Sequence, residues 1–146
     1  MTTLSLRSAL TAAAFAAALV LGAPSIAAAV DLKADLKGTN EVPPNDSKAT
    51  GSVALTWDAA SKKLSWKGSY SGLSGPATAA HFHTGEAGKN GGVAVPIFAG
   101  ATAKSPFEGS ATLNDAQAAD LMAGRLYVNI HTEAHKAGEI RGQVVK

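Results

Sequence analysis

The stretch D-L-K-A-D-L-K, residues 31–37, alternates polar and apolar side chains at every position. Successive side chains of a β-strand point to opposite faces, so this pattern predicts a strand with one buried and one solvent-facing side. The same alternation recurs in S-V-A-L-T-W, residues 52–57. These stretches indicate an all-β fold.

Further alternating segments follow, separated by Gly, Pro, Asn and Asp. Two prolines and the pair Asn45-Asp46 predict a connection over residues 40–46, and residues 58–61 predict a hairpin loop. The pattern is typical of a β-sandwich or barrel. Eight strands are expected, near residues 31–37, 52–57, 64–70, 77–83, 93–98, 108–113, 126–132 and 139–145.

One helical signal interrupts the strands. Asn114 can cap a helix, Asp115 lies in its first turn, and Gly124 can end it. We therefore expect one short helix at 114–123.

The first 29 residues are typical of a secretory signal peptide. Arg7 supplies a positive n-region, residues 8–22 are rich in Ala, Leu and Val, and residues 27–29 are small enough for cleavage. An uncleaved anchor is the alternative. Cleavage would release residues 30–146 as one domain, periplasmic or secreted and no longer attached to a membrane.

Composition narrows the possible functions. Lysine and arginine number 13 and acidic residues 11, for a net charge of +2, which gives no basis for nucleic-acid binding. The chain has no cysteine. Disulfides and thiolate ligands are therefore excluded, and any metal ion would be held by nitrogen and oxygen ligands.

All four histidines fall in two short groups, H-F-H at residues 81–83 and H-T-E-A-H at residues 131–135. Residues i and i+2 of a strand share a face about 6.6 Å apart, so His81 and His83 can converge on one ion. His131 lies on the polar face of its own predicted strand. His135 is either a fourth ligand or a solvent-exposed loop residue.

An all-imidazole shell favours copper, with zinc as the second choice. The alternative is a hydrogen-bonded cluster without metal. Glu86, Glu133 and Glu139 either orient a ring N–H or are solvated surface carboxylates. Arg141 either attracts an anion towards the metal or pairs with Glu139.

Four motifs in order resemble the chordin-type CHRD family: N-E-V-P-P (40–44), A-H-F-H (80–83), G-R-L-Y-V-N-I-H-T (124–132) and G-E-I-R-G-Q (138–143). This family includes bacterial exported proteins and modules of the animal protein chordin, and its function is poorly defined. It is itself similar to the copper/zinc superoxide dismutases, which implies an eight-stranded Greek-key, immunoglobulin-like barrel.

The dismutase resemblance implies roles for individual residues. His81 and His83 would form the copper pair, His131 a third ligand, and Arg141 the guide for superoxide. Copper would alternate between Cu(II) and Cu(I), oxidising one superoxide to O₂ and reducing a second to H₂O₂. Residues 84–92 contain no histidine, so no separate zinc site is expected.

Three hypotheses follow: a copper-binding barrel with superoxide dismutase activity, a copper carrier or buffer without turnover, and a protein-interaction module without metal. The sequence does not settle the oligomeric state.

Overall fold

The computed structural model describes residues 28–146, so the predicted signal peptide lies outside the described residues except for its last two positions. In this described part, eight strands and one α-helix confirm the all-β prediction. The elements are β1 (Val30–Lys37), η1 (Gly38–Asn40), β2 (Thr50–Asp58), β3 (Lys63–Ser71), β4 (Ala77–Thr84), β5 (Val93–Ala99), η2 (Gly100–Thr102), β6 (Phe107–Thr112), α1 (Asp115–Met122), β7 (Leu126–Thr132) and β8 (Ile140–Gln143).

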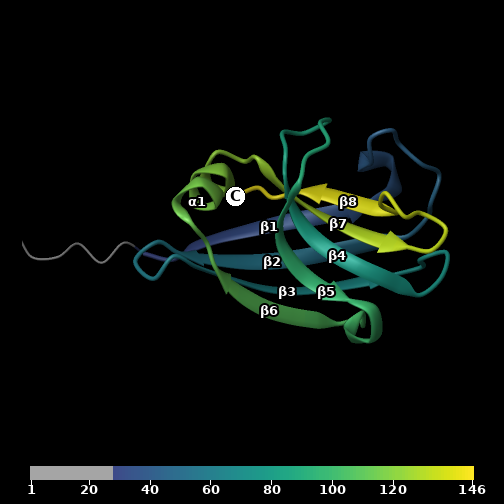
Figure 1. The fold of residues 1–146 in the computed structure, drawn as a ribbon, viewed down its shortest axis with the longest axis horizontal. Helices are drawn as coiled ribbons and strands as arrows, with labels where there is room; N and C mark the ends of the chain where they lie inside the picture. Colours follow the sequence, from purple (N-terminus) through teal and green to yellow (C-terminus); the bar gives the residue numbers. More distant parts are fainter. Residues whose placement is uncertain (1–27) are drawn as a thin grey trace, which may run out of the picture.

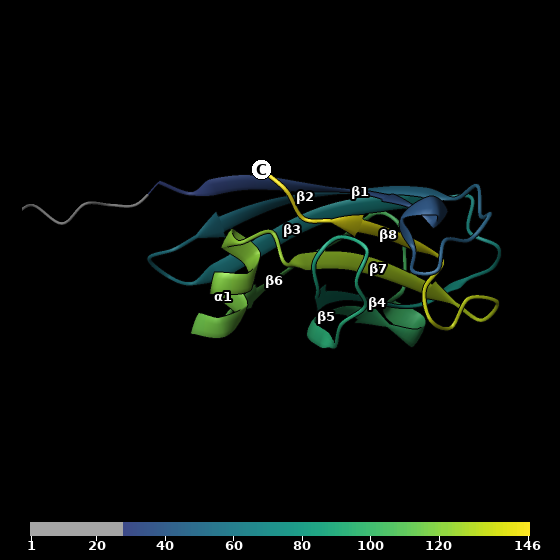
Figure 2. The ribbon, with the colours of Figure 1, turned by 90° about the horizontal axis from the view of Figure 1, so that it is seen from above.

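The strands form one antiparallel sheet in the order β5-β4-β7-β8-β1-β2-β3-β6. The sheet curls around a single core, so that β1, β2 and β3 lie across from β4, β5 and β7 (Figures 1 and 2). The two edge strands come together at the open seam, where the rings of Phe98 in β5 and Phe107 in β6 lie 5.2 Å apart. The fold is therefore a nearly closed barrel.

Alternation in the sequence becomes burial in the structure. In β1, Leu32, Ala34 and Leu36 are buried, while the residues between them are exposed. β4 and β7 contribute Phe82 and Val128, which face each other across the strand pair and are both fully buried. Because neighbouring residues project to opposite faces, the histidines of β4 and β7 lie on the outer side of the barrel.

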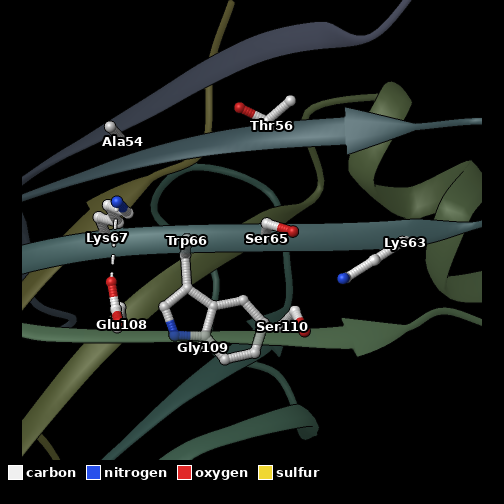
Figure 3. Close-up of a pocket in the computed structure, with 9 residues that line it drawn as sticks. All are labelled: Ala54, Thr56, Lys63, Ser65, Trp66, Lys67, Glu108, Gly109 and Ser110. Carbon is white, nitrogen blue, oxygen red and sulfur yellow. Dashed lines mark ion pairs between the residues drawn. The ribbon is translucent and has the colours of Figure 1, made fainter.

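Two glycines make room for aromatic rings inside the barrel. Gly109 in β6 lies directly opposite Trp66 in β3, whose ring extends across it (Figure 3). A Cβ atom at Gly109 would lie 2.7 Å from Cζ2 of Trp66. In a second pair of this kind the glycine is on β3 and the ring on β6: Gly68 lies opposite Phe107. An alanine at either position would collide with a ring that the core needs.

The predicted helix is confirmed and slightly shorter than expected. Asn114 caps it, and its side chain and that of Gln117 each bond to the other residue's backbone. The last strand also ends earlier than the predicted 145, because β8 stops at Gln143 and only an isolated bridge joins Val145 to Lys33. Among residues 28–146, no helix is both long and apolar enough to span a bilayer.

Candidate metal centre

The outer face of β4 and β7 brings three of the four histidines together. His81 and His83 project from β4, and His131 projects from the neighbouring strand β7. The pairing of β4 with β5 shifts register just before His81 and again just before His83. Such irregularities change the direction of side chains, and here they occur at both ligand positions.

Potential ligand nitrogens of these three histidines all lie within 4.8 Å of one another. Nδ1 of His81 is 3.2 Å from Nε2 of His131. Two nitrogens bound tetrahedrally to one ion at about 2.0 Å would be separated by roughly 3.3 Å, so this spacing suits a shared metal. The three residues form the histidine site.

Backbone carbonyls determine which nitrogens are free. Nδ1 of His83 lies 3.1 Å from the Gly91 oxygen, and Nδ1 of His131 lies 3.0 Å from the Lys136 oxygen. A carbonyl only accepts hydrogen bonds, so each Nδ1 carries the proton and each Nε2 keeps its lone pair. Nε2 of His83 is buried without a hydrogen-bond partner in the described part of the chain.

Burial lowers the pKa of all three histidines below the ordinary value of 6.5. For His83, the bond to Gly91 opposes this effect, while the Arg141 charge, and that of His81 when it is protonated, lower the pKa further. The rings are therefore neutral near pH 7, which is the form that binds a metal. Among the described residues, none of the acidic side chains considered from the sequence bonds to these rings; backbone carbonyls orient His83 and His131, and His81 contacts His131.

Tyr127 packs against His83, and Arg141 packs against Tyr127. The Tyr127 ring stacks on His83 with centroids 5.0 Å apart and an angle of 8° between the planes. The Arg141 guanidinium carbon lies 3.4 Å from the centre of the same ring. β7 lies between β4 and β8, so Tyr127 comes between the other two residues. The sequence placed Tyr127 on the polar strand face but gave it no role.

Arg141 is only 2% exposed. Its donors reach the backbone oxygens of Lys89 and Glu86 and the side-chain oxygen of Asn90. Neither an ion pair with Glu139 nor one with any other carboxylate occurs among the residues described. Arg141 thus binds the loop between β4 and β5 instead of the partner considered from the sequence.

A cleft of about 530 Å³ opens beside the histidine site. It is lined by His83 and Tyr127, by the segment Glu41–Asn45, and by His135. His135 is partly exposed and lies outside the group of three histidines. The structure therefore places His135 and His83 on the wall of the same cleft, whereas His81 and His131 do not line it.

Glu41 is a second residue to which the sequence gave no role, although it lies in the N-E-V-P-P motif. Burial raises its pKa to about 7, against the opposing effects of its hydrogen bond from Asn129 and of the Arg141 charge. It is 8% exposed and lines the cleft. A carboxyl group with a pKa near neutrality can hold or release a proton at physiological pH.

Glu139 differs from the surface carboxylate considered from the sequence. It is fully buried, and its oxygens accept bonds from the backbone and hydroxyl of Ser74, from Ser47 and from Thr132. Burial alone would raise its pKa, but these bonds lower it to about 2. Sequence reasoning missed this cluster because its serines come from separate loops.

Comparison with known proteins identifies the family. No curated protein and no solved structure matches the chain, so neither of these comparisons supports the expected likeness to dismutases. A family model, the CHRD domain, matches residues 32–144. The match covers every strand that contributes to the histidine site, and this chain therefore belongs to the CHRD domain family.

Proposed function

We propose that this protein binds one copper ion through His81, His83 and His131. The observation that carries the proposal is the buried Nε2 of His83, which has no partner in the described residues and lies beside two further imidazoles. A buried polar atom without a hydrogen bond costs free energy, and a bound metal would remove that cost. Burial keeps the rings of His83 and His131 neutral, and their Nδ1 bonds to backbone carbonyls leave Nε2 free for a metal.

Copper is favoured over other metals by the chemistry of the donors. Three imidazoles suit Cu(II) and Zn(II), and Cu(II) binds more tightly at a given nitrogen site. Mg²⁺ and Ca²⁺ require oxygen ligands, whereas the ligand group among residues 28–146 consists of three histidines. Zinc is the second choice.

Metal titration of the chain from Val30 tests the proposal. We expect one Cu(II) per chain by calorimetry and a nitrogen-coordinated Cu(II) spectrum by electron paramagnetic resonance. Replacement of both His81 and His83 by alanine should abolish both signals. Wild-type protein that binds no copper above the level of the double variant would contradict the proposal and favour a protein-interaction module.

Superoxide dismutation is a second candidate function, favoured by the cleft that leads from solvent to His83. A small anion needs such a path, and Glu41 at the cleft wall carries an exchangeable proton near neutral pH. Copper would supply the change of oxidation state that this reaction needs and that zinc cannot supply. Stopped-flow measurement of superoxide decay with the copper-loaded chain separates an enzyme from a copper carrier or buffer, which would show no turnover.

The proposed compartment is the periplasm or the exterior of the cell. This proposal depends on the signal-peptide character of residues 1–29. Mass spectrometry of the chain recovered after expression with its full N-terminus would test it, and a mature start at Val30 is expected.

A further inference from the structure

In the described part of the chain, the buried guanidinium of Arg141 has no hydrogen bond to a carboxylate; its hydrogen bonds go to one loop, and it lies over the Tyr127 ring. It donates to the Lys89 oxygen at 2.6 Å, to the Glu86 oxygen at 3.3 Å and to the Asn90 side chain at 3.1 Å. Burying a charge is costly unless its donors are satisfied. Here two backbone carbonyls and one amide oxygen accept three hydrogen bonds from the guanidinium, which offset part of that cost and tie Arg141 to residues 86–90.

The same loop ends at the residue that orients His83. Asn90 is followed by Gly91, whose oxygen lies 3.1 Å from Nδ1 of His83 and whose N–H donates to the Tyr127 hydroxyl at 3.2 Å. Gly91 also passes so close to Thr84 that a Cβ atom there would overlap the Thr84 carbonyl. The position of the Gly91 oxygen is therefore set by the loop path on one side and by Tyr127 on the other.

Tyr127 forms a second connection between Arg141 and His83. Its ring is parallel to the His83 ring and carries the Arg141 guanidinium over its centre. A cation is attracted to the negative face of an aromatic ring, and more strongly when both are removed from water. The stack holds the plane of the His83 ring while the Gly91 oxygen fixes which nitrogen is protonated.

We infer that Arg141 is a positioning residue for the histidine site: through Gly91 and Tyr127 it keeps His83 in the form with a proton on Nδ1 and a free lone pair on Nε2. This role replaces direct contact with an anion, since the guanidinium is only 2% exposed. The inference rests on the proposed metal binding for its purpose, but the state of His83 can be measured without metal.

The test compares Arg141→Gln with the wild type in metal-free, ¹⁵N-labelled protein. Long-range proton–nitrogen correlation distinguishes the two neutral forms of each histidine. We expect a single form of His83, protonated on Nδ1, in the wild type and a mixture of both forms in the variant. His131, whose Nδ1 faces Lys136 and not Gly91, should keep its form and serves as the internal reference.

Copper binding provides the second measurement. Loss of a residue that orients a metal ligand typically weakens metal affinity about 10- to 100-fold, so we expect that decrease for Arg141→Gln together with an altered Cu(II) resonance spectrum. Arg125→Gln is the matched control, because Arg125 pairs with Asp120 away from the site. This control should keep the wild-type spectrum and affinity.

Arg141→Lys keeps the charge but lacks the planar, forked donors, so it should give an intermediate decrease in affinity. If Arg141→Gln does not fold, Arg141→Lys decides the outcome by the same two measurements. An unchanged form of His83 and unchanged copper affinity in a folded Arg141 variant would overturn the inference while leaving the proposed function intact. A wild type that shows the Nδ1 form but binds no copper would overturn the proposed function instead.

Discussion

Two clusters of polar side chains meet at β7, and they differ in whether they are complete. His131 belongs to the histidine site on the outer side, and the next residue, Thr132, belongs to the Glu139 cluster on the other side. Every oxygen of the Glu139 carboxylate accepts hydrogen bonds, four in all. In the histidine site one buried nitrogen of His83 has no partner among the described residues.

This difference separates a structural cluster from a binding site. The Glu139 carboxylate gains nothing from a further ligand, because its bonding capacity is used by Ser47, Ser74 and Thr132. Ser47 lies in the loop before β2, Ser74 in the loop after β3, and Thr132 in β7. Glu139 therefore joins segments far apart in the sequence. The histidine site, by contrast, gains from an added metal ion.

The largest expected effect is the loss of stability when the hydrogen bonds of the Glu139 cluster are broken. Glu139→Gln brings N–H donors to a position already filled with donors and removes the negative charge. We expect a decrease of about 3 kcal/mol in the free energy of unfolding, measured in denaturant. Glu133→Gln is the control, since Glu133 is exposed and paired with Lys136 at the surface, where less than about 0.5 kcal/mol is expected. Equal effects would contradict the comparison.

The second-largest expected effect is the stabilisation of the native state when copper binds to the histidine site. At a free copper concentration 100 times the dissociation constant, a ligand specific for the native state stabilises it by about 2.7 kcal/mol. Thermal unfolding should therefore shift upward with copper in the wild type and in Glu139→Gln. The shift should be absent when His81 and His83 are both alanine, and its persistence there would place the metal elsewhere.

Lowering the pH should remove the stabilising contributions of the two clusters over different pH ranges. Burial depresses the histidine pKa values below 6.5, so the native state loses their contribution as the pH falls below 6.5. The pKa of Glu139 is lowered from 4.5 to about 2, so its contribution is full above pH 4.5 and is lost as the pH falls from 4.5 towards 2. Glu41 acts oppositely, because its raised pKa gives a contribution that is lost as the pH rises from 4.5 towards 7.

The contribution of each cluster can be measured in metal-free protein as the difference in unfolding free energy between the wild type and a variant at each pH. The stability difference between the wild type and the double alanine variant of His81 and His83 should decrease below pH 6.5. The difference between the wild type and Glu139→Gln should stay constant down to about pH 4.5 and then decrease. Denaturant unfolding at each pH provides the measurement, and two parallel curves would contradict the assignment.

The smallest effect is expected at the cleft wall. His135→Ala should lower copper affinity less than about tenfold, or 1.4 kcal/mol, because His135 lies outside the group of three. Competition titration with a copper chelator measures this change. A decrease as large as that for His131→Ala would identify His135 as a fourth ligand.

Much of the fold could be predicted because burial follows alternation along each strand. The positions of His81, His83 and His131 followed from the same rule, since each lies on the polar face of its strand. The environments of Arg141 and Glu139 could not be predicted in this way. Their partners lie in loops such as 86–90 and 73–75, whose paths depend on long-range contacts that no local pattern encodes.

The pairing of β8 has a consequence for how the chain is made. β8 lies between β7 and β1 in the sheet. Lys37 of β1 can therefore pair with Arg141 of β8 only after residues 37–141 have been synthesised. A ribosome-bound chain whose β8 has not yet been synthesised has both a free β1 edge and no anchor for the loop at 86–90. The domain can therefore complete its sheet only after β8 has left the ribosome.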